Sequence, residues 1–179
     1  MSSSTDKASD LSTDYWIRRW LEDDIGWHHQ ETNDHLLSHW HQLGVKSGAE
    51  VFVPMCGKSR DMVWLQQQGY SVLGVEISPK AVNDFFTEQN LTPTRSAYGA
   101  FELYQAPGYR LLCGDIYELK REHLQGVTAV YDRASLVALD PQQQQRYARL
   151  LSDKLPSGAS MLLVSMDYPE NEMQGPPYS

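Results

Sequence analysis

The sequence predicts an α/β fold, with a doubly wound, mostly parallel sheet that carries helices on both faces. Two observations support this prediction. From residue 50 onward, short apolar runs alternate with longer amphipathic segments, which is the pattern of strands connected by helices. The apolar runs are hydrophobic almost throughout, as expected for strands that are buried on both faces.

Two helices are expected before the alternating part of the chain. The segment 14–21 begins with a possible N-cap and has apolar residues at helical spacing, so it predicts a short amphipathic helix. A second helix is expected over 35–43. Thr32 or Asn33 can cap its start, and Gly44 ends it.

The alternating part predicts five strands, at 51–53, 71–76, 110–113, 127–131 and 160–165. Helices are expected between them, over 59–68, 78–89 and 140–154. Two of these helices have explicit start signals. Ser78-Pro79 and Asp140-Pro141 each place a capping side chain before a proline at the first helical position.

The last strand predicts an exposed hydrophobic edge. Met161-Leu-Leu-Val164 is apolar throughout, yet only fifteen residues follow it, and three of them are prolines. We therefore expect a domain that is truncated at its C-terminus. The predicted organisation is a disordered N-terminal tail at 1–13 and a single, incomplete domain at 14–179.

The ends of the first two strands predict a nucleoside site. Gly57 lies in the turn after the first strand, and Glu76 ends the second strand 19 positions later. Ligands bind where the carboxyl ends of parallel strands meet, and a carboxylate there can accept two hydrogen bonds from ribose hydroxyls. The alternative is a purely structural turn with a solvated Glu76.

The turn 54–59 favours a cofactor that has a nucleoside but no phosphate. A dinucleotide fingerprint needs three glycines, and this turn contains only Gly57. A P-loop needs a glycine five positions before Gly57, where Phe52 stands. S-adenosyl-L-methionine meets the requirement.

Composition excludes several function classes. The net charge of −8 argues against nucleic-acid binding, which depends on clustered Lys and Arg. No apolar run reaches the ~20 residues of a membrane span, and the N-terminus lacks the apolar core of a secretory signal. Cys56 and Cys113 are too few for a disulfide framework. We expect a cytoplasmic protein.

The histidines do not predict a metal site. His35 and His39 are four positions apart, as in some zinc-binding helices, but the glutamate between them and a third ligand are missing. The expected metal content is none.

Several segments together resemble the thiopurine S-methyltransferase family, including its bacterial members that act on selenium and tellurium compounds. The resemblance spans almost the whole chain beyond the tail, and the Pro-x-Cys-Gly-Lys turn is quite specific. The segments are 15–20 (YWIRRW), 25–28 (IGWH), 53–58 (VPMCGK), 72–78 (VLGVEIS), 85–90 (FFTEQN), 131–138 (YDRASLVA) and 175–178 (GPPY).

The resemblance implies a class I methyltransferase fold with S-adenosyl-L-methionine as cofactor, and it implies roles for ten residues. Trp16 and Trp20 correspond to an aromatic lid over the cofactor, although core packing is the alternative from spacing alone. Glu76 corresponds to the ribose acid, and Arg133 to a residue at the methionine end. The other implied cofactor contacts are Met55, where the family more often has Leu, Gly57, Asp115 and Ile116, the last two beside the adenine. The implied substrate side is Trp27, where the family commonly has Phe, and His28.

The implied function is transfer of a methyl group to the sulfur of thiopurines or aromatic thiols, or to selenium or tellurium compounds in detoxification. Such an enzyme works mainly by aligning its reactants, so we expect no dedicated catalytic base. The full-length protein is expected to be a monomer. Two alternatives remain: a non-catalytic fragment that binds S-adenosylmethionine, and a nicotinamide-dependent oxidoreductase, against which the missing glycines argue.

Overall fold

The computed structural model describes residues 13–169, 172–173 and 175–179. The predicted tail therefore lies outside the described residues, except Thr13, which is the first residue of helix α1 and not part of a tail. Seven strands form one sheet in the order β3-β4-β5-β2-β1-β6-β7. Strands β1, β2, β5, β6 and β7 are parallel, and β3 and β4 pair antiparallel with their neighbours.

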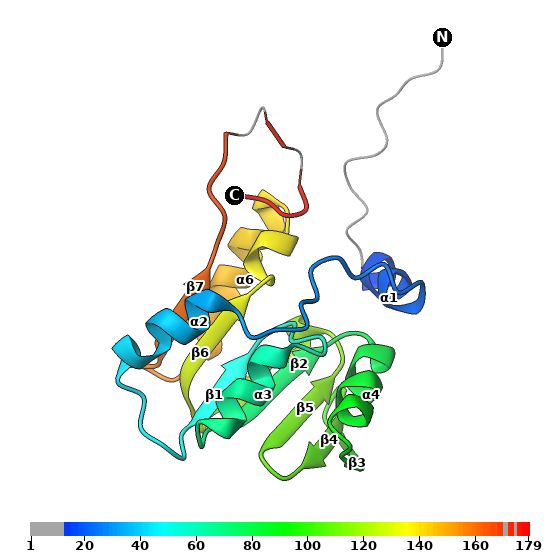
Figure 1. The fold of residues 1–179 in the computed structure, drawn as a ribbon, viewed down its shortest axis with the longest axis vertical. Coiled ribbons are helices and arrows are strands. Elements are labelled where there is room, and N and C mark those ends of the chain that lie inside the picture. The colour runs from blue at the N-terminus through cyan, green and yellow to red at the C-terminus, as the bar shows by residue number, and fades with distance from the viewer. Residues whose placement is uncertain (1–12, 170–171, 174) are drawn as a thin grey trace.

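All five predicted strands are present, with slightly different ends. They are β1 (Glu50–Val53), β2 (Ser71–Glu76), β5 (Tyr109–Cys113), β6 (Val127–Arg133) and β7 (Ser160–Val164). The hairpin β3 (Thr94–Tyr98) and β4 (Phe101–Ala106) has no counterpart in the prediction. It extends the sheet beyond β5, so the fold is mixed at that edge (Figure 1).

All the predicted helices are present, and Asn33, Ser78 and Asp140 cap theirs as expected, but α1 begins at Thr13, so Asp14 lies in its first turn and is not its N-cap. They are α1 (Thr13–Leu21), α2 (Asp34–His39) with the 3-10 turn η1 (Trp40–Leu43), α3 (Arg60–Gln67), α4 (Pro79–Glu88) and α6 (Pro141–Lys154). Short elements complete the chain: η2 (Ile116–Glu118), α5 (Arg121–Leu124) and η3 (Leu136–Ala138). The side chains of Asn33, Ser59, Ser78 and Asp140 accept hydrogen bonds from backbone N–H groups at the starts of their helices.

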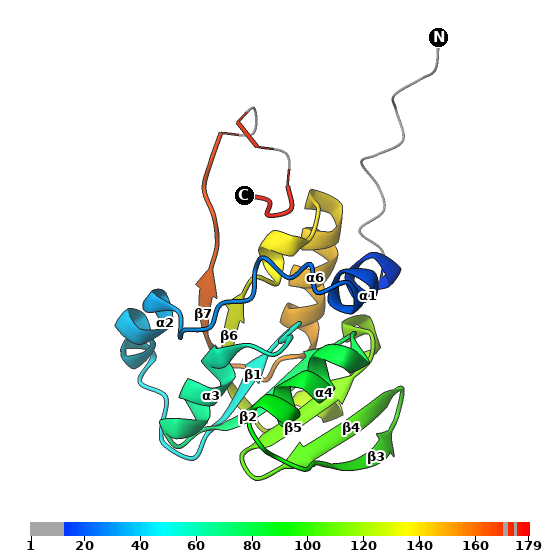
Figure 2. The ribbon, with the colours of Figure 1, turned by 45° about the vertical axis from the view of Figure 1, so that its right-hand side comes forward.

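The sheet separates two hydrophobic clusters, which confirms the doubly wound architecture. Figures 1 and 2 show helices α3 and α4 in front of the sheet and α6 behind it. Helices α2, α3 and α4 pack on one face, and α5 and α6 pack on the other. Alternation along β1 shows why: Val51 and Val53 belong to the first cluster, and Phe52 belongs to the second. Both faces of the central strands are thus covered by apolar side chains.

Strand β7 lies at the edge of the sheet in the described part of the chain, as predicted. Leu162 and Val164 pack against the cluster that contains α2 and α3. Met161 and Leu163 point to the opposite face and are 38% and 41% exposed. No helix among the described residues is long and apolar enough to cross a membrane.

Candidate active site

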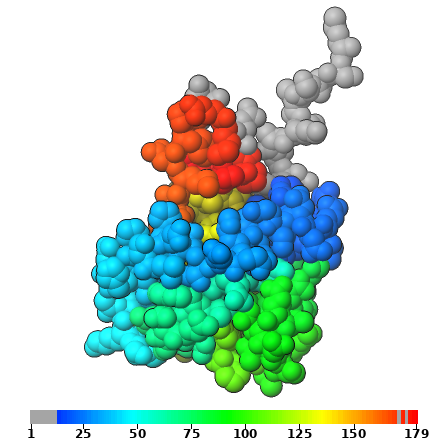
Figure 3. Space-filling model, viewed as in Figure 1, coloured from blue at the N-terminus to red at the C-terminus, as the bar shows by residue number. Residues whose placement is uncertain are grey.

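A cavity of about 1030 Å³ opens at the carboxyl ends of the parallel strands. Its lining residues lie at or just after the ends of β1, β2, β5, β6 and β7, so every parallel strand contributes to it. The other walls come from α1 and from the connecting segment, which we define as residues 22–33. Figure 3 shows this segment lying across the front of the molecule between α1 and α2. In a doubly wound sheet, this edge is where ligands bind.

Glu76 is a buried carboxylate, only 4% exposed, in the wall of the cavity. Its Oε2 accepts a hydrogen bond from the backbone N–H of Gly57 at 2.8 Å, and its Oε1 accepts one from Ser78 at 2.8 Å. Burial raises the pKa of Glu76, and the backbone hydrogen bonds from Ser78, Gly57 and Ile77 oppose that rise. Each oxygen keeps a further lone pair for a hydroxyl donor.

The turn after β1 has a strained backbone. Met55 and Gly57 have φ angles of 44° and 52°, in the left-handed region. Ala134, after β6, has φ 62° and lines the same cavity. Non-glycine residues rarely adopt this conformation, and such strain concentrates at functional sites.

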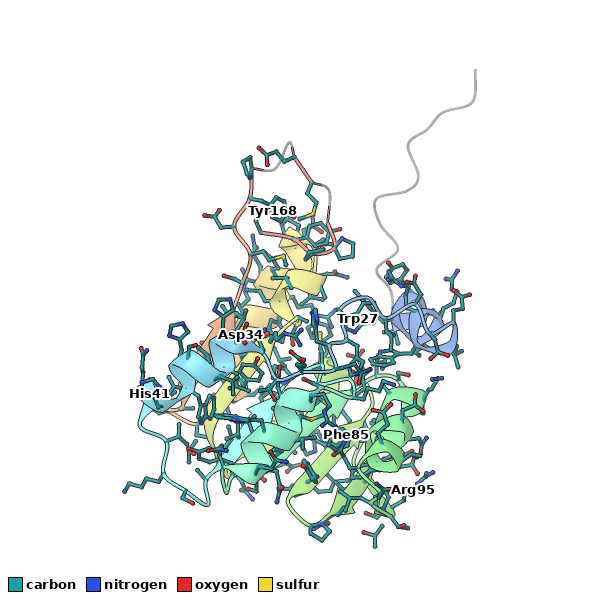
Figure 4. The ribbon with its side chains drawn as sticks, viewed as in Figure 1. Trp27, Asp34, His41, Phe85, Arg95 and Tyr168 are labelled. Atoms are coloured by element: carbon teal, nitrogen blue, oxygen red, sulfur yellow. The ribbon has the colours of Figure 1, made fainter. Side chains whose placement is uncertain are left out.

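Three tryptophans form an aromatic cluster over the cavity. Trp27 of the connecting segment packs edge-to-face against Trp16 and Trp20, with ring centroids 5.3 and 5.8 Å away. Figure 4 places Trp27 beside α1. The guanidinium of Arg19 lies 4.9 Å from the centroid of Trp27. Trp20 is buried, and Trp16 and Trp27 are half-buried.

His28 presents an unpaired nitrogen beside this cluster. Its Nε2 is buried and has no hydrogen-bond partner among the described residues. Burial, followed by the positive charge of Lys58, lowers the pKa of His28. The imidazole is therefore neutral at neutral pH, when its two ring nitrogens offer one donor and one acceptor.

Arg133, at the end of β6, pairs with Asp61 and not with the adjacent Asp132. The two neighbouring residues therefore do not form an ion pair with each other. The Arg133 Nη1 lies 3.5 Å from Oδ2 of Asp61, and its Nη2 donates to the backbone carbonyl of Trp27 at 3.3 Å. Asp132 instead accepts a 2.6 Å hydrogen bond from Tyr147 on the far face.

Asp115 and Ile116 form the wall after β5. The exposed Asp115 caps η2 by accepting from the N–H of Tyr117 at 2.9 Å, and Ile116 is buried. The guanidinium of Arg146 lies 3.7 Å from the centroid of the Tyr117 ring. This end of the cavity therefore combines the apolar Ile116 and the aromatic Tyr117 with two charged side chains, Asp115 and Arg146.

All ten residues named from the sequence line this one cavity: Trp16, Trp20, Trp27, His28, Met55, Gly57, Glu76, Asp115, Ile116 and Arg133. Sequence reasoning missed Asp61 and Arg146. Asp61 pairs with Arg133, which is 72 positions away, and Arg146 lies over Tyr117, which is 29 positions away. No local pattern therefore marks either residue. The described residues contain no group of three His, Cys, Asp or Glu that could hold a metal.

The solved structures that this fold resembles include methyltransferases of low sequence identity. One is a TehB-like SAM-dependent methyltransferase from Corynebacterium glutamicum, with a TM-score of 0.52 and 14% identity, over 83% of this chain and 71% of that one. Another is the glycopeptide N-methyltransferase MtfA complexed with S-adenosyl-L-methionine, with a TM-score of 0.59 and 15% identity, over 78% and 57% of the two chains. At this identity they support the class I methyltransferase fold alone.

Sequence relatives define the family. The family model described as thiopurine S-methyltransferase matches residues 11–179. Thiopurine S-methyltransferase of Nitrosospira multiformis is 48% identical over 169 residues, which cover 94% of this chain and 77% of the relative. That of Pseudomonas entomophila is 46% identical over 165 residues, or 92% and 76% of the two chains. The chain belongs to the thiopurine S-methyltransferase family and is an S-adenosylmethionine-dependent methyltransferase.

Proposed function

We propose that this chain transfers the methyl group of S-adenosylmethionine to the sulfur of a thiopurine or an aromatic thiol. One observation carries the proposal most strongly. A buried carboxylate, a tryptophan cluster and an arginine face the same cavity at the carboxyl ends of the parallel strands. The names of the relatives support a thiopurine as acceptor.

The cavity suits the cofactor in size and in chemistry. Glu76 would accept the ribose hydroxyls with the lone pairs that Gly57 and Ser78 leave free. Arg133 would hold the carboxylate at the methionine end. Ile116 would lie against the adenine ring, with Asp115 at its rim.

The three tryptophans would close over the reacting groups. When bound, S-adenosylmethionine supplies a methyl group on a positively charged sulfur, which becomes a neutral thioether on transfer. The faces of Trp16, Trp20 and Trp27 can attract this cation and exclude water. His28 lines the same cavity and would lie beside the acceptor.

The residues act by alignment. Thiopurines and aromatic thiols ionise readily near neutral pH, so the acceptor sulfur needs no strong base. Holding nucleophile and methyl donor in line can lower the barrier by about 7–11 kcal/mol. The neutral His28 can accept a hydrogen bond from an acceptor N–H or donate one, and so fix its orientation.

Finer aspects of the function extend this proposal. Selenium and tellurium compounds are further candidate acceptors, because the selenium or tellurium atom carries a lone pair that is a soft nucleophile, like the sulfur of a thiolate. A cytoplasmic location fits the two free cysteines, Cys56 and Cys113. A monomer is the expected state of the full-length protein. The retained alternative is a fragment that binds the cofactor without transferring its methyl group.

A methyl-transfer assay with radiolabelled S-adenosylmethionine tests the proposal. The acceptor panel contains a thiopurine, an aromatic thiol, selenite and tellurite, and Glu76→Ala is the control. Label should appear in the thiopurine or thiol product, and Glu76→Ala should transfer little at low cofactor concentration. Binding of S-adenosylhomocysteine without transfer to any acceptor would favour the non-catalytic alternative.

A further inference from the structure

Asp61 is a buried carboxylate that stands behind the cavity and does not line it. It lies in the first turn of α3 and is 1% exposed. A buried charge is costly unless several polar groups compensate it. The identity of those groups therefore shows what the carboxylate holds in place.

The partners of Asp61 come from two separate parts of the chain, the connecting segment and β6. Its Oδ1 accepts a hydrogen bond from the backbone N–H of Asn33 at 2.8 Å. Its Oδ2 accepts one from the hydroxyl of Tyr131 at 2.9 Å and lies 3.5 Å from Nη1 of Arg133. The two oxygens thus hold two different walls of the cavity.

The Oδ1 side fixes the connecting segment. Asn33 is its last residue and the N-cap of α2, so the hydrogen bond from its N–H anchors the segment at that end. The Oδ2 side fixes Arg133, which also donates to the carbonyl of Trp27 in the same segment. Asp61 and Arg133 therefore hold the connecting segment at two points, Asn33 and Trp27, and His28 lies between these points.

The arginine retains donors for a ligand. A guanidinium has five N–H groups in a fixed plane. One points to Asp61 and one to the carbonyl of Trp27, while the side chain lines the cavity. The carboxylate behind it sets the plane in which the remaining donors can meet an anionic group.

We infer that Asp61 is a positioning residue for methyl transfer. It sets the direction of Arg133 toward the cofactor and, through Asn33, the place of the connecting segment that faces the acceptor. This inference rests on the proposed role of Arg133 at the cofactor carboxylate. A carboxylate that served only to stabilise the fold would affect melting alone.

Two substitutions separate the two sides of Asp61. Asp61→Asn keeps one oxygen for the N–H of Asn33 but loses the charge that pairs with Arg133. Asp61→Ala loses both contacts. Tyr131→Phe is the matched control, because it removes a hydrogen bond to the same Oδ2, and Tyr131 does not line the cavity.

The experiment measures the Kd of S-adenosylhomocysteine by calorimetry, the acceptor kcat and KM, and thermal melting, on the full chain. Asp61→Asn and Arg133→Gln should each raise the Kd about tenfold, as expected for one charge-assisted contact. Because both act through one guanidinium, the double variant should be no worse than Arg133→Gln. Tyr131→Phe should melt earlier with an unchanged Kd. Asp61→Ala should also raise the acceptor KM.

The outcomes distinguish this inference from the proposed function. A normal Kd in Asp61→Asn, with a raised Kd in Arg133→Gln, overturns the inference and leaves the role of Arg133 intact. Effects that add in the double variant also overturn it. A normal Kd in Arg133→Gln overturns both. If Asp61→Asn does not fold, Asp61→Glu tests the inference in its place. Its carboxylate is displaced by one methylene, so it should still raise the Kd of S-adenosylhomocysteine.

Discussion

The indole ring of Trp20 lies directly on the backbone of Gly57. A Cβ placed on Gly57 would be 2.8 Å from Cζ2 of Trp20, closer than side-chain carbons approach in proteins. The N–H of the same glycine donates to Glu76. The contact between Trp20 and Gly57 therefore joins α1 to the turn whose N–H holds the buried carboxylate of Glu76.

Gly57→Ala should therefore weaken cofactor binding. The added methyl group would displace Trp20, and the φ of 52° adds a backbone cost of about 1–2 kcal/mol. We expect at least a roughly tenfold higher Kd for S-adenosylhomocysteine, measured by calorimetry.

Gly48→Ala is the control, because Gly48 has φ 83° but nothing within 4 Å of its added Cβ. It should lose stability and keep the wild-type Kd. Equal Kd values in the two variants would show that the contact has no part in binding.

Glu76→Ala should weaken cofactor binding by about 2–3 kcal/mol at neutral pH, if its carboxylate holds the ribose hydroxyls. Circular dichroism should show that the variant remains folded. An unchanged affinity in a folded variant would remove Glu76 from the ribose site.

Binding should also depend on pH through Glu76. Burial raises the pKa of Glu76 in the folded protein. The contribution of this group to the free energy of unfolding is therefore fully present below the pKa of the unfolded chain, and it is lost as pH rises through the pKa of the folded protein. The ionised form is the one that binds hydroxyl donors. Wild-type affinity should therefore fall as pH drops through the raised pKa, relative to Glu76→Gln, whose affinity lacks this dependence. Parallel pH profiles for the two proteins would contradict the assignment.

Local signals in the sequence predicted the helix starts and the strand ends that build the site. The cap and proline pairs at Ser78 and Asp140 form as expected, and Gly57 and Glu76 meet across two neighbouring strands. These features depend on short-range chemistry or on the register of adjacent parallel strands, both of which a sequence pattern carries.

Other features depend on contacts that a local pattern does not contain. Strand β3 is mostly exposed and polar, so its residues show no clear alternation, and the hairpin escaped prediction. Asp61 and Arg133 are 72 positions apart, and only the folded sheet brings them together. The aromatic cluster likewise needs the path of the connecting segment, which has no regular structure.

Helix α1 should become ordered when cofactor or its demethylated product binds. Of its residues only Trp20 is buried, and the start of the connecting segment behind it is tied to α4 by an exposed ion pair between Asp23 and Lys80, at 2.9 Å. Exposed ion pairs contribute little stability, so the helix gains much of its burial by closing over a ligand. Amide exchange over 14–27 should slow when S-adenosylhomocysteine is added. Peptides from α3 serve as the control and should not change. Equal amide protection with and without ligand would show that Trp16 and Trp20 are ordinary core residues.

The edge strand β7 should make this 179-residue chain prone to self-association. Met161 and Leu163 place two exposed apolar side chains on the strand that forms the edge of the sheet in the described part of the chain, which is the arrangement that favours pairing with another strand. The double variant Met161→Thr, Leu163→Thr keeps a residue with good strand propensity and removes the apolar surface. It should lower light scattering at high concentration with little change in melting temperature.

Leu162→Ala is the matched control on the same strand. Leu162 packs into the core beside α2 and α3, so its truncation should cost about 1–2 kcal/mol of unfolding free energy, less than for a fully buried leucine, and leave association unchanged. Because the cavity residues Gly57, Glu76 and Arg133 lie on other elements, both variants should retain cofactor affinity. A wild-type chain that stays monomeric at high concentration would show that the edge is protected by other means. Association that persists in the double variant would place the contact elsewhere on the molecule.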